Sequence, residues 1–169
     1  MLENTTDLAR FAAKFLEEFN NFCRDNDLIG KVKADHIGVR CSSVEKYESQ
    51  RKLFESDSRF IYQEIISKRR ISLIGLNDGL ETVVGSLNFL ELSDQKPDGS
   101  QIDQIDHLEI IPTSISYEQL IESLRNNKVE VKEAVRPHHT TYDIVLNSGF
   151  MVRLSKEMLI DKIKREEIV

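Results

Sequence analysis

The sequence has no tryptophan, and its 169 residues include only three prolines, seven glycines and two cysteines. So little glycine and proline excludes collagen-like and low-complexity chains. Two cysteines, Cys23 and Cys41, cannot form a disulfide framework, so we expect them to be reduced and buried. No apolar run approaches the ~18 residues of a membrane-spanning helix, and the first residues lack the pattern of a secretory signal. We therefore expect a cytoplasmic protein without membrane contact.

Basic residues are fewer than acidic ones, with 23 Lys and Arg against 29 Asp and Glu. The formal net charge is −6, with 31% charged and 40% hydrophobic residues. No stripe of Lys and Arg with interleaved aromatic residues is present, so nucleic acid is not an expected partner. The hydrophobic fraction is sufficient for the core of one compact domain.

A short motif occurs twice. Asp35-His36 and Asp106-His107 each open an apolar run of period 2, and the two histidines are 71 positions apart. A histidine at the start of a buried strand must be hydrogen-bonded or bound to a metal. Two of them in equivalent places suggest a duplicated module in which each half contributes one ligand to a shared site.

The remaining periodicity predicts the same order of elements around each motif, a strand, a helix and three strands. The predicted elements are a helix at 5–26; a strand at 34–41, a helix at 43–56 and strands at 60–67, 70–76 and 82–92; a strand at 104–111, a helix at 116–127 and strands at 129–134, 139–146 and 150–154; and a last helix from Ser155. Asn77-Asp78-Gly79 is predicted to be a turn.

The fold class is therefore α+β, built from two β-α-β-β-β modules. We expect one domain over 1–169, divided into an N-terminal helix and connection at 5–30, module one at 31–92, a linker at 93–103, module two at 104–154 and a C-terminal helix at 155–169.

Phenylalanines recur on the N-terminal helix at three- and four-residue steps. The predicted apolar stripe consists of Leu8, Phe11, Phe15, Phe19, Phe22 and Cys23. We expect this stripe to pack against the sheet. The alternative is a helix that binds a partner protein.

The doubled order and the two strand-initial histidines resemble the vicinal oxygen chelate superfamily, which includes glyoxalase I, methylmalonyl-CoA epimerase and the extradiol dioxygenases. Within it, the segments 34–41 (ADHIGVRC) and 106–110 (DHLEI), together with the added N-terminal helix, look most like the YecM family. The resemblance implies that the two modules form a curved mixed sheet around a cleft, and that the cleft holds a divalent metal.

The same resemblance implies that metal ligands come from the first and last strands of each module, here His36, Glu91 and His107. Strand parity supports Glu91, because it shares a face with Leu87 and Phe89 and would point into an apolar concavity. There a carboxylate needs a cation or a donor. Two histidines and one carboxylate suit Mn, Fe, Co, Ni or Zn.

At the fourth ligand position the sequence departs from this pattern, because Arg153 stands there and an arginine cannot bind a cation. Arg153 either clamps a substrate carboxylate or phosphate, or forms an ion pair with Glu91 that fills the site. Arg40 shares the face of His36 and is a second candidate for binding the substrate.

Several further polar residues have two readings each. His139, beside His138, is either a surface residue or a functional one, and in the second case it supplies a fourth metal ligand or acts as a general acid or base; Glu109 is a second candidate base because it shares the face of His107. The aspartates of the two motifs are either strand-edge residues or partners that orient the imidazoles, although strand parity would place them on the opposite face. The segment 68–70 (KRR) is predicted to be a solvated turn.

Three functions are consistent with these patterns. The first is a metal-dependent isomerase, lyase or dioxygenase that acts on a small anionic oxygenated substrate. The second is a metal-free module of the same fold that binds a small anion without catalysis, and the third is an interaction protein. Motifs for nucleotide binding, serine hydrolysis and thiol redox chemistry are absent. A monomer and a homodimer are equally compatible with two modules in one chain.

Overall fold

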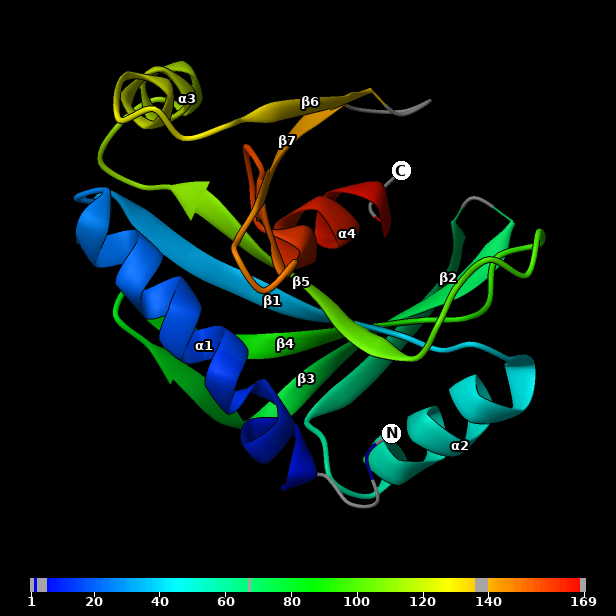
Figure 1. The fold of residues 1–169 in the computed structure, drawn as a ribbon. Coiled ribbons are helices and arrows are strands. Elements are labelled where there is room, and N and C mark those ends of the chain that lie inside the picture. Colours follow the sequence, from blue (N-terminus) through cyan, green and yellow to red (C-terminus); the bar gives the residue numbers. More distant parts are fainter. Residues whose placement is uncertain (1, 3–5, 67, 136–139, 168–169) are drawn as a thin grey trace.

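In the computed structural model the chain forms one curved, eight-stranded mixed sheet with four helices (Figure 1). The structure describes residues 2, 6–66, 68–135 and 140–167, without the side chains of 165–167. The elements are α1 (Asp7–Asp25), β1 (Val32–Arg40), α2 (Val44–Glu55), β2 (Phe60–Ile66), β3 (Arg69–Thr82), β4 (Gly85–Ser93), β5 (Gln104–Pro112), α3 (Tyr117–Asn126), β6 (Lys132–Val135), β7 (Thr140–Val145), β8 (Met151–Leu154) and α4 (Leu159–Glu167).

The strand order confirms the predicted pair of modules and the α+β class. Across the sheet the strands run β2-β3-β4-β1-β5-β8-β7-β6. Within each module the first and last strands are parallel neighbours, β1 with β4 and β5 with β8. The modules join where β1 and β5 pair antiparallel. The strands that carry the two Asp-His motifs therefore lie side by side at the centre of the sheet.

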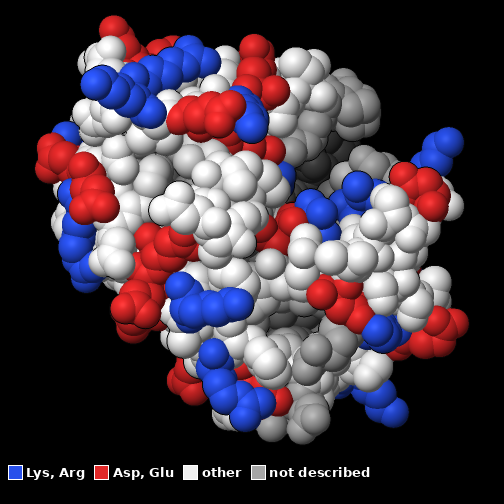
Figure 2. Space-filling model, in the orientation of Figure 1, with Lys and Arg blue, Asp and Glu red and all other residues white. Residues whose placement is uncertain are grey.

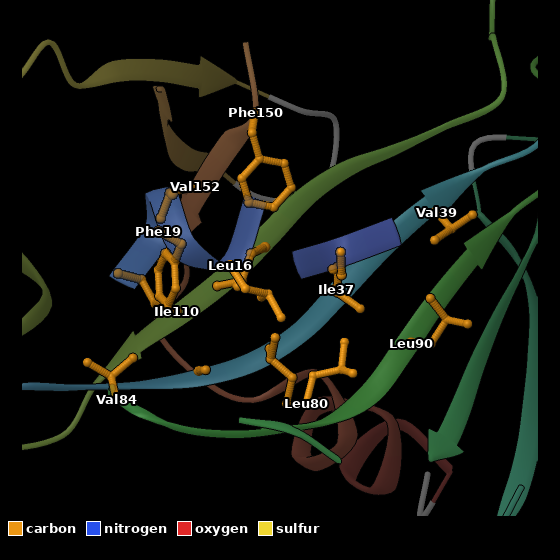
Figure 3. Close-up of a cluster of buried hydrophobic side chains, with 14 of the residues drawn as sticks. Leu16, Phe19, Ile37, Val39, Leu80, Val84, Leu90, Ile110, Phe150 and Val152 are labelled. Atoms are coloured by element: carbon orange, nitrogen blue, oxygen red, sulfur yellow. The ribbon is translucent and has the colours of Figure 1, made fainter. Parts of the chain in front are cut away.

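The two faces of these central strands have different neighbours. Ile37 and Val39 of β1 lie in the hydrophobic core with Leu16 and Phe19 of α1 (Figure 3). Because successive strand residues point to opposite faces, His36 points away from this core and into the curve of the sheet. The helix α4 lies inside that curve (Figure 1). Its first backbone N–H, that of Leu159, donates to Asp35 Oδ2 at 2.9 Å, so α4 is attached to the motif of module one.

The helix α1 packs on the sheet as predicted, but with a different stripe. Its buried positions are Asp7, Leu8, Ala12, Leu16, Phe19 and Cys23. Phe11 is 43% exposed, and Phe15 stacks on Phe150 of module two with ring centroids 4.9 Å apart. Of the predicted stripe, Leu8, Phe19 and Cys23 are buried and Phe15 and Phe22 pack against the core, so the prediction is wrong only for Phe11 and for omitting Ala12 and Leu16. Since α1 covers the core, the third function, a partner-binding helix, has no support from its packing.

Two predicted boundaries were wrong. Asn77-Asp78-Gly79 is no turn between strands, because β3 continues through it to Thr82. Leu76 and Leu80 are buried on either side and hold the segment on the sheet, while the register with β4 shifts between Gly75 and Leu80. The last helix begins at Leu159 instead of Ser155. In the described part of the chain, no helix has the length and apolarity to cross a membrane.

Candidate metal centre

His36 and His107 meet inside the curve of the sheet. Both are buried, and their ring centroids lie 5.5 Å apart with the rings nearly perpendicular. Gly38 makes this approach possible because it is the register partner of His107 across the β1–β5 pair. A Cβ at Gly38 would lie 2.3 Å from His107 Cε1 and 2.4 Å from Nδ1. The glycine is therefore needed to leave room for the imidazole.

Each histidine is held by the aspartate before it in the sequence. Asp35 Oδ2 lies 3.0 Å from His36 Nδ1, and Asp106 Oδ2 lies 3.0 Å from His107 Nδ1. Strand parity had placed the aspartates on the opposite face, but the β1–β5 ladder is irregular at both motifs. Asp35 and His36 together oppose the single residue Glu109, and Asp106 is the extra residue on β5. Such bulges re-aim side chains, so both aspartates lie on the side of their imidazoles, as the reading of them as orienting partners requires.

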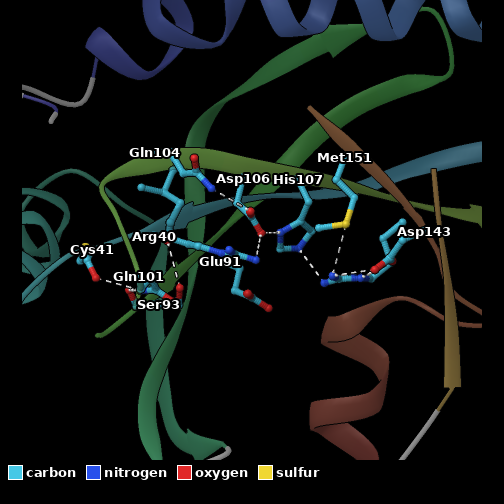
Figure 4. A network of polar contacts seen from close by, with 12 residues as sticks. Arg40, Cys41, Glu91, Ser93, Gln101, Gln104, Asp106, His107, Asp143 and Met151 are labelled. Carbon is cyan, nitrogen blue, oxygen red and sulfur yellow. Dashed lines mark hydrogen bonds and ion pairs between the residues drawn. The ribbon is translucent and has the colours of Figure 1, made fainter. Parts of the chain in front are cut away.

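These hydrogen bonds turn the other ring nitrogen of each histidine, Nε2, toward the centre of the site. Glu91 of β4 reaches the same point, with Oε2 3.8 Å from His36 Nε2. Ligand atoms of His36, Glu91 and His107 all lie within 4.8 Å of one another. The predicted trio is thus brought together by three neighbouring strands, and Figure 4 shows Glu91 and His107 converging.

A divalent metal fits this centre. His36 Nε2 is buried and has no hydrogen-bond partner among the described residues, and a buried polar atom without a partner is costly. Two imidazoles and a carboxylate are ligands that Zn, Mn, Fe, Co and Ni accept. An aspartate behind each imidazole is the usual support of a metal-binding histidine.

Without a metal, the centre favours a proton on His36. Burial alone lowers the pKa of His36, but the carboxylates of Glu109, Asp35 and Glu91 outweigh it and raise the pKa to about 9. Burial likewise raises the pKa of Glu91, yet its electrostatic interactions with His107, His36 and Arg153 hold it below its ordinary value. A metal at the centre would displace the proton of His36, so metal binding there depends on pH.

Of the two predicted catalytic residues, the structure describes Glu109 but not His139. Glu109 lies at the centre, with Oε2 3.9 Å from His36 Nε2 and a side chain only 12% exposed. It also belongs to a second group of potential ligands, with Asp35 and His36. His139 lies outside the described residues.

Arg153 contacts the centre from β8. Its ion pair within the described residues is with Asp143 at 2.9 Å, and not with Glu91, which was one of the two readings of this arginine. Its Nη1 lies 3.3 Å from His107 Nε2. Since Asp106 accepts the Nδ1–H of His107, Nε2 is left as an acceptor, and Arg153 donates to the lone pair that a metal would use.

A cavity of about 200 Å³ opens beside the trio. It is lined by Gly38, Val39, Arg40, Arg69, Glu91, Ser93, Lys96, Asp106, His107 and Arg153. The predicted substrate residues Arg40 and Arg153 are therefore both at the cavity, and Arg40 forms an ion pair with Asp106 at 2.6 Å. Figure 2 shows basic and acidic side chains together at the edge of a hollow in the right half of the visible face.

Sequence reasoning missed two of the four basic side chains at this cavity. Arg69 had been assigned to a solvated turn, but it is partly buried at the start of β3 and bonds Gln101 and the carbonyl of Asp94. Lys96 belongs to the segment predicted as a linker. Neither position belongs to a periodic pattern. Only the pairing of β3 with β4, which sets Arg69 beside the end of β4, could have indicated that Arg69 lies at the cavity.

A larger cavity of about 390 Å³ lies beside α1, with Phe11, Phe15 and Phe150 among its lining residues. Among the described residues, the groups of potential metal ligands lie at the centre between β1 and β5 instead. The smaller cavity, beside these potential metal ligands, is therefore the candidate functional site.

The paired modules bring two equivalent histidines together at one centre. The chain belongs to the YecM family, whose sequence model, described as YecM protein, matches residues 3–159. Among curated proteins, no sequence matches this chain.

Several solved structures resemble it. The structural-genomics protein EC4020 has a TM-score of 0.72 and 18% identity, over 98% of this chain and 94% of that one. A methylmalonyl-CoA epimerase in complex with methylmalonyl-CoA and NH4+ has a TM-score of 0.48 and 16% identity, over 77% and 97%. The hydroxyglutarate synthase from Oryza sativa in complex with 2-oxoadipate has a TM-score of 0.48 and 12% identity, over 94% and 79%.

Proposed function

We propose that this protein binds a divalent transition metal through His36, Glu91 and His107, and that it acts on a small anionic oxygenated substrate as an isomerase, lyase or dioxygenase. The observation that carries the proposal is that ligand atoms of these three side chains lie within 4.8 Å of one another, and that one of them, the buried His36 Nε2, has no hydrogen-bond partner among the described residues.

The chain's own residues would prepare this centre for substrate. A bound divalent metal supplies Lewis-acid polarisation of substrate oxygens. Asp35 and Asp106 hold the two imidazoles in the orientation that presents Nε2. His139, the candidate proton acceptor from the sequence, keeps that role as a proposal.

The cavity restricts the substrate by size and charge. Its volume of about 200 Å³ is below the roughly 300–1,000 Å³ of pockets for drug-sized ligands, so we expect a small acid. Four basic side chains and two carboxylates line it, which leaves a positive surplus before a metal adds its charge. Arg40 and Arg153, which line the cavity, are the side chains that we propose to bind a carboxylate or phosphate group of the substrate.

A second candidate function is the metal-free binding of a small anion. The contact between Arg153 Nη1 and His107 Nε2 favours it, because the arginine already occupies a nitrogen that the metal needs. In that case the basic side chains would bind the anion and no turnover would follow.

Elemental analysis separates the two functions. The protein is purified without tag or chelator and its metal content measured by ICP-MS, beside the variants Glu91→Gln, His107→Ala and the exposed control Glu122→Gln. About one transition metal per chain, lost in the first two variants and kept in the control, is expected. Failure of the wild type to take up added Mn, Fe, Co, Ni or Zn would reject the metal-dependent function in favour of anion binding.

A further inference from the structure

The two modules place equivalent residues at the centre, and one exchange breaks their symmetry. Two positions after the histidine, module one has Gly38 and module two has Glu109. On the last strand, Gly38 pairs with Glu91 and Glu109 pairs with Arg153. Each module therefore brings one carboxylate to this row of the sheet, on its last strand in module one and on its first strand in module two.

A steric clash explains why module one cannot carry its carboxylate on its first strand, β1, as module two does on β5. A side chain at Gly38 would collide with the imidazole of His107, so the carboxylate of module one must come from β4. In module two the β8 position holds Arg153, whose guanidinium is fixed by Asp143. In module two the carboxylate is therefore carried by Glu109 on β5, the strand beside β8.

The distances from the central nitrogen are nearly equal. Glu91 Oε2 lies 3.8 Å and Glu109 Oε2 lies 3.9 Å from His36 Nε2. Donors bound to one metal at roughly 2.0–2.2 Å lie about 3–3.5 Å apart. Both carboxylates would thus need to approach His36 Nε2 by about half an ångström to bind the same ion. Glu109 is grouped within 4.8 Å with Asp35 and His36 and not with Glu91 and His107, so its side chain would also have to turn toward those two residues.

The spacing of Glu109 from His107 points the same way. Residues two apart on a strand share a face, so the His-x-Glu segment of β5 directs an imidazole and a carboxylate to the same side. Two histidines with a strand-borne carboxylate form a ligand set that iron and related metals use.

We infer that Glu109 is the fourth protein ligand of the metal and replaces the carboxylate that Arg153 displaces from β8. This inference rests on the proposed function, because it requires that the centre binds a metal. With two imidazoles and two carboxylates a four-coordinate zinc site would be closed. A six-coordinate ion such as Mn, Fe, Co or Ni would keep two positions open, which suits a substrate that binds through two oxygens.

Cobalt(II) is the probe, because its visible absorption bands report coordination. Co2+ is titrated into metal-free wild type, Glu109→Gln, Glu91→Gln and the control Glu122→Gln, and binding is followed by calorimetry and absorption. We expect Glu109→Gln and Glu91→Gln each to lose at least tenfold in affinity and to alter the bands, while the control binds as the wild type does. Circular dichroism checks that each variant is folded.

Glu109→Cys tests the assignment directly. A thiolate bound to Co2+ gives an intense near-ultraviolet charge-transfer band, which we expect in this variant and not in Glu122→Cys. If wild type binds Co2+ but Glu109→Gln binds it equally and Glu109→Cys shows no such band, Glu109 is no ligand and the proposed function survives. If wild type binds no Co2+ at all, the proposed function fails and this inference fails with it.

Discussion

Replacing Arg153 by methionine is expected to strengthen metal binding, although the residue lies at the centre of the site. Arg153 Nη1 lies 3.3 Å from His107 Nε2, and Asp106 binds the opposite ring nitrogen. A metal can use Nε2 only after that hydrogen bond is broken. Methionine keeps much of the apolar volume of the arginine and has no donor, so Arg153→Met leaves the lone pair available.

The magnitude follows from the interaction that is removed. A hydrogen bond from a charged donor contributes about 1.5–3 kcal/mol, and about 1.4 kcal/mol corresponds to a tenfold change in affinity. We therefore expect Arg153→Met to bind Co2+ about 10- to 100-fold more tightly than wild type. The loss of a positive charge beside a divalent cation acts in the same direction.

Calorimetric titration of chelator-treated protein with Co2+ in an anion-poor buffer measures this change. Arg10→Met, at a side chain that is 70% exposed, is the matched control. Because Arg153→Met leaves Asp143 without its ion pair with Arg153, the double variant with Asp143→Asn tests whether a fold defect hides the effect. Equal or weaker Co2+ binding by the folded single and double variants would refute the view that Arg153 blocks His107.

Three further perturbations test the same centre. Gly38→Ala should displace the His107 ring, weaken Co2+ binding and destabilise the protein by about 1–3 kcal/mol, as measured by calorimetry and urea unfolding; unchanged binding would contradict the close approach. In the folded, metal-free protein the pKa of His36 is raised from 6.5 to about 9. The protonated histidine therefore stabilises the folded state, and this contribution is complete below pH 6.5. It is lost as the pH rises to 9, and the free energy of unfolding then falls by at most about 3 kcal/mol. Urea unfolding across this range should show the decline in wild type but not in His36→Gln. Asp106→Asn should weaken Co2+ binding about 10- to 100-fold, and an unaltered titration would show that its hydrogen bond to His107 has no part in metal binding.

Much of the fold could be predicted because its signals are periodic and occur twice. Alternating apolar residues identified the strands, and the repeated Asp-His motif placed β1 and β5 in equivalent positions. Parity on one strand correctly turned Glu91 toward the centre, because β4 is regular around that residue. The metal-ligand role of the trio remains a prediction that the geometry supports.

The misses have a common physical origin in irregular backbone. Strand parity fails at a bulge, so it placed Asp35 and Asp106 on the wrong face, and the turn signal at 77–79 proved to be an irregular part of β3. Arg69 reaches the cavity because β3 starts beside the end of β4, which is a long-range pairing. Such pairings are set by tertiary packing, and local residue patterns do not encode them.

The hydrogen bond between Asp35 and Leu159 has a consequence for how the protein is made. Asp35 Oδ2 accepts from the imidazole of His36 and also from the first backbone N–H of α4, 124 residues further along the chain. A nascent chain thus exposes its first histidine early, yet the aspartate behind that histidine gains its second partner only when α4 has left the ribosome. The centre is therefore completed only after α4 has been made, and a nascent chain that still lacks α4 has yet to assemble it fully.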